Sequence, residues 1–184
     1  MTACMFFFVS CRKDEHPEET LNDNIPGTFF DVSFGANKDD LIRHFGEHGF
    51  HIIENQSTGK LLHFSPRNGS YSYEGMRWGH LMAEMSEDSF CSIEFYRVFK
   101  DKAEAISYGN SLLNAVSGKY RLAEAERKNK SIYILYGGES KNEPGRKMVV
   151  FVERYESFDK SILYRTGLAY CDGTYMASVR DNYK

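Results

Sequence analysis

Two segments with helical periodicity interrupt a chain whose other apolar residues mostly alternate, as they do in strands. The first segment carries Leu41, Ile42 and Phe45 at helical spacing. Asn37 is placed to cap its first turn, and Gly49 is placed to end it. This pattern predicts a short amphipathic helix.

The second helical segment runs from about residue 101 to residue 116. Its apolar residues Ala103, Ile106, Leu113 and Val116 are predicted to form the stripe that faces the core. It is the only other long segment with this period, so most of the remaining core must come from strands.

Alternating or compact apolar runs between Gly- and Asn-rich turns predict the strands. The predicted strands are residues 29–34, 50–54, 60–65, 71–78, 80–86, 90–99, 131–136, 147–155 and 161–170. The charged segment 123–130 is predicted to be a connection. The order β-α-β5-α-β3 favours the α+β class, with an antiparallel sheet of about seven to nine strands and two main helices packed on one side.

The composition fits one globular domain and excludes some partners. The chain has 184 residues, of which 41% are hydrophobic and 15% aromatic. Its net charge of -3 provides no basic field for nucleic acid. No apolar run approaches the roughly eighteen residues that a transmembrane helix requires. Membrane attachment is therefore expected only through a lipid anchor.

The N-terminus changes abruptly from an apolar run to charged residues. Residues 5–9 are apolar, Ser10 precedes Cys11, and the charged residues 12–15 follow. Phe8-Val9-Ser10-Cys11 resembles the lipobox of bacterial lipoproteins, and Lys13-Asp14-Glu15 resembles the export signal of Bacteroidota-type surface lipoproteins. The resemblance implies that Cys11 is lipidated and becomes the first residue of the mature protein.

This resemblance predicts a lipoprotein-type signal over residues 1–11, a flexible tether over residues 12–28 and one α+β domain over residues 29–184. The protein would then be lipid-anchored in the cell envelope, at the periplasmic or outer-membrane surface. The apolar run is short and no basic residue precedes it, so the alternative is an apolar N-terminus of a cytoplasmic protein.

The two helical segments also carry the resemblance that concerns the fold. Leu41 is followed eight residues later by Gly49-Phe50, and the sequence LLNAVSGKY ends the second helix. These spacings resemble small uncharacterised secreted lipoproteins with a tandem helix-plus-antiparallel-sheet fold of the β-lactamase-inhibitor-protein type. The resemblance implies a fold and does not imply an activity.

Two cysteines remain in the mature domain if Cys4 is removed and Cys11 is acylated. In an oxidising envelope compartment, Cys91 and Cys171 would be able to form a disulfide. The alternative is two separately buried thiols, because free cysteine is among the most buried residue types. The sequence leaves both alternatives open.

His44-Phe45-Gly46-Glu47-His48 satisfies the inverted zinc-peptidase pattern H-x-x-E-H. On a helix, His44 and His48 would lie on one face and would be able to bind zinc, with Glu47 as the base. A third ligand is required, and Gly46 and Gly49 weaken and end the helix. We therefore expect histidines at the edge of an amphipathic surface, and we predict no cofactor.

An aromatic cluster offers a second candidate site. Tyr71, Tyr73 and Trp78, with Arg77 beside them, have the flat rings and polar edges that occur at sugar and protein interfaces. The alternative is structural, with the two tyrosines on one face of a strand and Trp78 in the core under the first helix.

These observations predict a non-catalytic cell-envelope lipoprotein that acts as a binding module for a protein or glycan ligand. The first alternative is a zinc-dependent hydrolase that uses His44, Glu47 and His48. A second is a purely structural component of an envelope assembly. The sequence does not specify the ligand, the side of the membrane or the oligomeric state.

Overall fold

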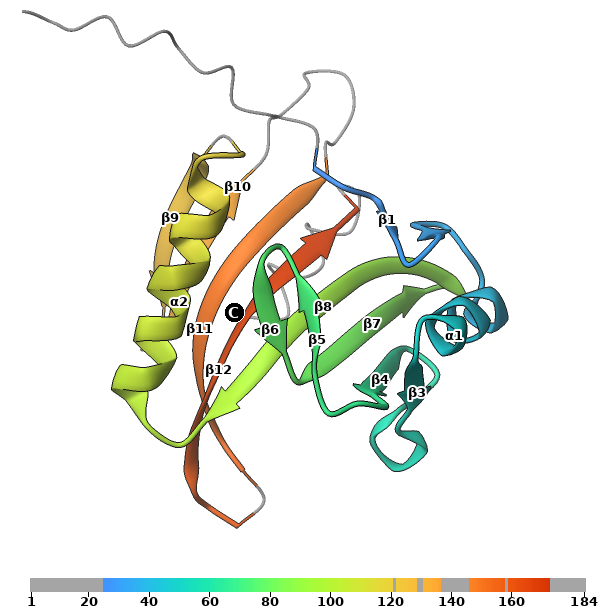
Figure 1. Cartoon of the computed structure of the whole chain (residues 1–184), viewed down its shortest axis with the longest axis horizontal. Helices are drawn as coiled ribbons and strands as arrows, with labels where there is room; N and C mark the ends of the chain where they lie inside the picture. Colours follow the sequence, from blue (N-terminus) through green and yellow to red (C-terminus); the bar gives the residue numbers. More distant parts are fainter. Residues whose placement is uncertain (1–24, 121, 129–130, 137–145, 158, 173–184) are drawn as a thin grey trace, which may run out of the picture.

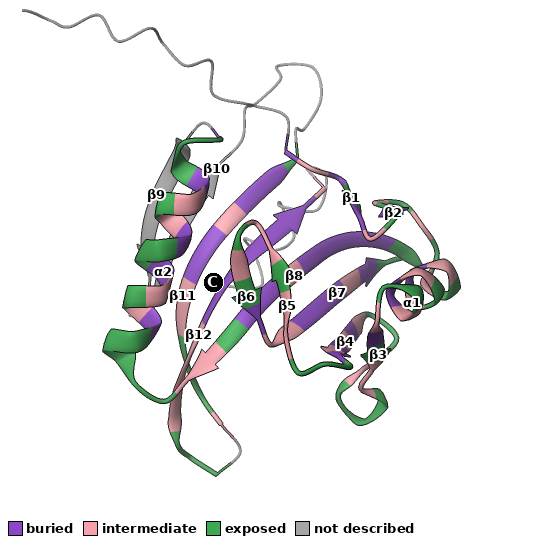
Figure 2. Cartoon of the chain, viewed as in Figure 1, coloured by how far each residue is buried: buried purple, intermediate pink, exposed green. Residues whose placement is uncertain are grey.

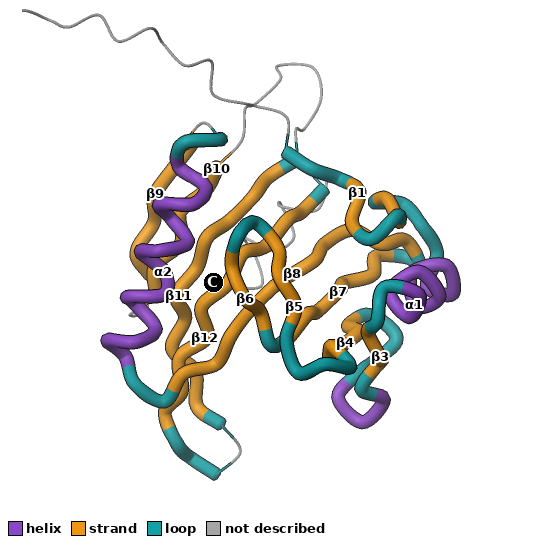
Figure 3. Tube along the Cα trace, in the orientation of Figure 1, coloured by secondary structure: helices purple, strands orange, loops and turns teal. Residues whose placement is uncertain are grey.

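The computed structural model describes residues 25–120, 122–128, 131–136, 146–157 and 159–172. These residues form an α+β fold with two α-helices and antiparallel sheets (Figures 1 and 3). The α+β class predicted from the sequence is confirmed.

The elements follow one another in the order strand pair, helix, strands, helix, strands. They are β1 (Thr28–Phe29), β2 (Val32–Ser33), α1 (Lys38–Glu47), β3 (Phe50–Ile52), the 3-10 helix Glu54–Gln56, β4 (Leu61–Pro66), β5 (Tyr71–Tyr73), β6 (Met76–Trp78), β7 (His80–Ser86), β8 (Ser89–Phe99), α2 (Lys102–Ser117), β9 (Leu122–Lys128), β10 (Ser131–Tyr136), β11 (Lys147–Glu156) and β12 (Ile162–Cys171).

The largest sheet is built around the long strands β8, β11 and β12. Six strands with described side chains pair in the order β3-β4-β7-β8-β12-β11. The backbone ladder continues beyond β11 through β10 and β9. Every pairing in the sheet is antiparallel, so the meander expected for β10, β11 and β12 is confirmed.

Both helices contribute to one core on one face of this sheet. Leu41 and Phe45 of α1 and Leu112 of α2 lie in the same apolar cluster as Phe95 of β8 and Leu168 of β12. Figure 1 shows α1, α2 and the small hairpin β5–β6 in front of the sheet. Figure 2 shows that the buried positions follow the central strands.

Local signals place both helices where the sequence predicts them. The Asn37 side chain accepts a hydrogen bond from the backbone N–H of Asp40, and Asp101 caps α2 in the same way through Glu104. Each cap satisfies a backbone donor that the first helical turn leaves without an intrahelical partner.

The predicted inner stripe of α2 is correct at two of its four positions. Ala105, Gly109, Leu112 and Val116 are the buried residues of the helix. Of the predicted positions, Val116 is buried and Leu113 is partly buried against the core. Small residues let the helix lie close to the sheet, since a Cβ at position 109 would be 2.8 Å from the side chain of Val152.

Two predicted strands are hairpins. Residues 71–78 fold back at Glu74 and Gly75, both of which have positive φ, to pair β5 with β6. Residues 29–34 turn at Phe30 and Asp31, with φ of 50° and 62°. Positive φ at both central residues is the geometry of the two-residue turns that match strand twist.

The charged segment 123–130 was wrongly predicted to be a connection. Leu122–Lys128 forms strand β9, which pairs with β10. β9 is the last strand in the described order of the sheet, and edge strands commonly carry charged residues in their sequence.

The folded part begins earlier than the predicted end of the tether. Ile25 is 1% exposed and belongs to the main core. Its burial fixes the chain just before β1.

The packing around Gly167 of β12 leaves no room for a larger side chain. An added Cβ would lie 2.5 Å from the backbone oxygen of Phe95 and 2.5 Å from Cζ of Phe151. The backbone oxygen cannot rotate away, so we expect Gly167→Ala to lower the free energy of unfolding by about 2 kcal/mol. Urea denaturation measures this loss. Gly59→Ala, where no atom lies within 4 Å, is the control, and equal stability of the two variants would contradict the packing.

Candidate functional site

The predicted aromatic cluster lies mostly in the core. Trp78 is fully buried, and its Nε1–H donates to the carbonyl of Tyr73 at 2.9 Å. The Tyr73 ring stacks on Phe95 with centroids 4.3 Å apart, and the Tyr71 hydroxyl donates to the carbonyl of His80. These rings support the β5–β6 hairpin on the sheet. Trp78 lies in the core as the structural alternative expected, but its ring packs against Phe95 and against Tyr108 of the second helix, not the first.

Burial also fixes the ionisation state of the two tyrosines. It raises the pKa of Tyr73 to about 12 and raises the pKa of Tyr71 well above its ordinary value. Both phenols therefore stay protonated at neutral pH and serve as hydrogen-bonding core residues.

Arg77 is the one member of the predicted cluster that is exposed. Its Nη2 donates to the Ser70 hydroxyl at 2.7 Å. Its backbone carbonyl accepts a hydrogen bond from the Tyr108 hydroxyl of α2, which lies 31 residues away in the sequence. The structure therefore brings Arg77 next to a helix that the sequence does not connect with it.

Arg97 lies beside the same tyrosine. Its Cζ lies 5.2 Å from the centroid of the Tyr108 ring and 5.4 Å from that of Phe99. Stacking of a guanidinium on aromatic rings is favourable and restricts its orientation. We call Arg77, Arg97, Phe99 and Tyr108 the arginine–tyrosine site.

The charges of the arginine–tyrosine site are not balanced by ion pairs within the described residues. The cations whose side chains form ion pairs include Arg43, Lys119 and Arg165. Neither Arg77 nor Arg97 has a carboxylate within 4.0 Å in the described part of the chain. The site therefore presents exposed positive charge on a partly aromatic surface that is held in place by the Tyr108 hydrogen bond and the ring contacts.

Sequence reasoning missed Arg97, Phe99 and Tyr108. The usable signal is that Arg97 alternates with Phe95 and Phe99 and so lies on the apolar face of β8. A charged residue on such a face requires a partner or an exit to water. No comparable signal links this strand to Tyr108.

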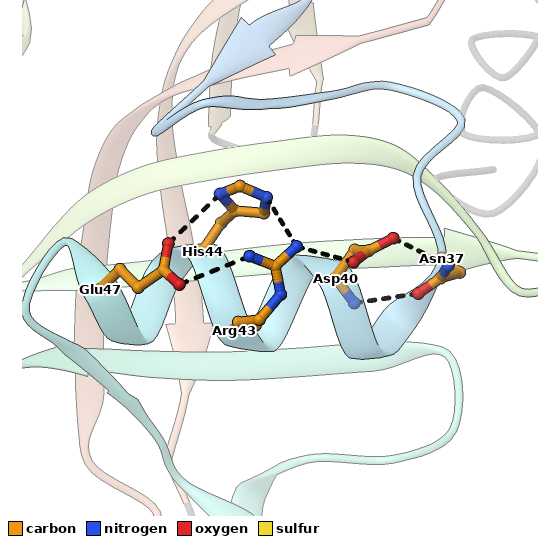
Figure 4. A network of polar contacts seen from close by, with 5 residues as sticks. All are labelled: Asn37, Asp40, Arg43, His44 and Glu47. Atoms are coloured by element: carbon orange, nitrogen blue, oxygen red, sulfur yellow. Dashed lines mark hydrogen bonds and ion pairs between the residues drawn. The ribbon is translucent and has the colours of Figure 1, made fainter.

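The zinc-type motif forms a surface network on α1 (Figure 4). His44 lies 3.6 Å from Glu47 and 3.0 Å from Arg43. His48 Nε2 is 2.8 Å from the carboxylate of Asp31. The two histidines thus have different partners, and no group of three potential ligands that would hold a metal occurs in the described residues.

The same network shows ordinary helix-surface electrostatics. Arg43 pairs with Asp40 at 2.9 Å and with Glu47 at 3.4 Å. The hydrogen bond from Arg43 lowers the pKa of Asp40. Glu47 is held by this pairing, and the arrangement stabilises a solvated helix face.

Cys91 and Cys171 are buried free thiols, so the disulfide is not formed. Cys91 Sγ donates to the carbonyl of Glu84 at 3.2 Å, and Cys171 Sγ lies 3.4 Å from the Ser92 hydroxyl. Cys171 is paired in register with Ser92, not with Cys91. Burial raises the pKa of each thiol to about 12, which keeps both in the less reactive protonated form.

The other face of the sheet carries a buried charge cluster. The Nε and Nη2 atoms of Arg165 donate to Glu153 at 3.1 and 2.6 Å, and its Nη1 lies 3.2 Å from Glu94. The guanidinium is also 5.2 Å from the Tyr96 ring and 5.3 Å from the Phe151 ring. Two carboxyl groups thus share one guanidinium.

Burial dominates the ionisation of this charge cluster. The Glu94 side chain is 14% exposed, and desolvation raises its pKa to about 7 against the opposing effect of Arg165. Desolvation likewise lowers the pKa of His63 and of His80. Near neutral pH the charge cluster is close to electrically balanced, which favours a structural role.

No family model, curated protein or solved structure matches this chain. Function must therefore be argued from the residues and their geometry.

Cys11, the lipidation residue, lies outside the described residues, as does the rest of the lipobox. Among the described residues, neither helix is long and apolar enough to cross a membrane.

The raised pKa of Glu94 predicts how stability depends on pH. The folded state holds this proton up to about pH 7, whereas the ordinary pKa is 4.5. The contribution is therefore full below pH 4.5 and is lost as pH rises through 7. Between these limits the stability of the wild type should fall by roughly 2–3 kcal/mol relative to Glu94→Gln.

Chemical denaturation at several pH values measures this difference. Glu54→Gln, at an exposed position, serves as the control and should follow the wild type. Parallel pH profiles for the wild type and Glu94→Gln would show that the pKa of Glu94 is the same in the folded and unfolded protein, which would contradict the prediction.

Proposed function

We propose that this chain is a non-catalytic cell-envelope lipoprotein that binds a protein or glycan ligand. A lipid on Cys11 would anchor it at the periplasmic or outer-membrane surface, and residues 12–24 would separate the anchor from the domain. The Ser10-Cys11 pair and the charged residues after it support this placement. Two or more acyl chains would hold the protein stably, as one chain binds only marginally.

The arginine–tyrosine site is the observation that carries the binding proposal. Arg97 is exposed, rests against two aromatic rings and has no carboxylate partner among the described residues. The hydrogen bond from Tyr108 to Arg77 fixes the hairpin against α2 beside it. A preorganised surface whose guanidinium N–H groups have no carboxylate partner among the described residues is suited to binding.

The chemistry of the same residues supports a non-catalytic role. Guanidinium groups remain protonated in proteins and only donate hydrogen bonds, so they do not act as general bases. The glutamate and the two histidines whose pKa is shifted by burial, Glu94, His63 and His80, lie on the other face of the sheet, beside Arg165 and Tyr96. The sheet therefore separates these titratable groups from the proposed binding site.

Lipidation is tested by expressing the chain from its natural upstream DNA in its host. We expect the mature protein to begin at an acylated Cys11 and to sediment with membranes. Cys11→Ser should lose the acyl mass and the membrane association, since the anchor is the proposed attachment. Mass spectrometry of the N-terminus and membrane fractionation measure both results. An intact Met1 on the wild-type protein would contradict the proposal.

Binding is tested separately with glycan and protein arrays. Arg97→Ala should reduce the signal on every bound ligand at least about tenfold, because charge-assisted hydrogen bonds would be lost. Arg43→Ala, which changes the charge equally on α1, should retain the wild-type signal. Equal losses in the two variants would place binding elsewhere.

A further inference from the structure

We infer that the arginine–tyrosine site recognises an acidic glycan through the carboxylate or sulfate groups of its sugars. This inference rests on the proposed binding function and names its ligand class. The juxtaposition that carries it is the exposed guanidinium of Arg97 from β8 on the Tyr108 ring of α2, next to β6, where the backbone carbonyl of exposed Arg77 accepts a hydrogen bond from the same tyrosine.

The first argument concerns the charge of Arg97. By comparison, the guanidinium of exposed Arg43 lies within 3.4 Å of two carboxylates. Arg97 instead contacts the rings of Phe99 and Tyr108, and its charge has no acidic partner in the described part of the chain. Ring contacts orient the guanidinium without neutralising it, so its N–H donors remain suited to a planar anion.

Arg77 supplies the second positive charge. Its Nη2 donates to the Ser70 hydroxyl, which is uncharged and leaves the guanidinium charge in place. Because Tyr108 bonds to the Arg77 backbone, the hairpin cannot move away from α2 without breaking this contact. A second exposed arginine on the strand that bonds to the same tyrosine favours a ligand with repeated negative charges over one with a single charge.

The aromatic rings favour a glycan over an acidic peptide. Phe99 and Tyr108 are half-buried, so part of each residue remains accessible to solvent beside Arg97. Such rings pack against the apolar faces of sugars, and tyrosine adds a polar edge. A carboxylate or sulfate on the same sugar would reach the guanidinium groups.

One acidic residue beside the site should weaken the binding of an anion, and removing its charge provides a test. Glu104 lies one helical turn before Tyr108 on α2 and is exposed. Residues at this spacing are neighbours on a helix surface. Its negative charge should repel an anionic ligand, so removal of this charge should strengthen binding.

The experiment compares charged and neutral forms of the same polymers on the full chain carrying Cys11→Ser. The probes are dextran sulfate against dextran, and polygalacturonate against its methyl ester, with affinity measured by calorimetry. We expect the charged polymers to bind and the neutral polymers not to bind, with binding that weakens as salt is added.

The variants assign this binding to the site. Arg97→Gln should weaken it about tenfold, Arg77→Gln should weaken it to a smaller extent, and Glu104→Gln should strengthen it. Arg43→Gln, which removes the same charge from α1, should leave it unchanged. Thermal unfolding of each variant confirms that the fold is retained.

Each other outcome overturns the inference in a distinguishable way. Equal binding of neutral and charged polymers would leave the glycan-binding function in place and remove the acidic specificity. Binding of polyglutamate in preference to both polysaccharides would identify an acidic protein as the ligand. Binding that weakens equally in Arg43→Gln and Arg97→Gln would mean that general surface charge is responsible. No binding to any of these probes would remove both the inference and the glycan branch of the proposed function.

Discussion

The packing of aromatic rings on Phe95 holds distant parts of the chain together. Its ring contacts those of Phe30 near the N-terminus, Tyr73 and Trp78 of the β5–β6 hairpin, and Tyr170 of β12. Pairs of this kind add stabilisation beyond the area that they bury. The hairpin stays on the sheet because of these contacts, and so the exposed arginine that it carries has a fixed position.

The sheet separates the buried charge cluster around Arg165 from the proposed binding site at Arg97. Beside Phe95, the next residue Tyr96 lies on the opposite face, where Arg165 contacts its ring and pairs with two carboxyl groups. Burial makes charge costly there, and desolvation raises the pKa of Glu94 even though Arg165 favours its charged form. Exposed Arg97 is free of this constraint, and its charge can interact with a ligand.

The sequence predicts helices and strands correctly where capping and periodicity signal them. It fails where a contact with a distant part of the chain determines the local structure. Asn37 and Asp101 mark the helix starts, because a cap bonds only within its own first turn. Alternation predicts a continuous strand through Glu74 and Gly75, but the chain turns there. The Glu74 carboxylate accepts hydrogen bonds from Lys119 and Tyr120, which follow α2. Those contacts stabilise a turn that alternation alone does not indicate.

The sequence by itself determined the α+β class, the two helices and most of the strand segments, because periodicity and capping depend on near neighbours. It also identified Arg77 as a residue beside aromatic side chains. Only the tertiary structure decided that Trp78 is buried while Arg77 is exposed, and that Tyr108 brings Arg77 and Arg97 to one surface. The reason is physical: these residues come from β6, β8 and α2, and their proximity depends on how the hairpin and helix pack against the sheet.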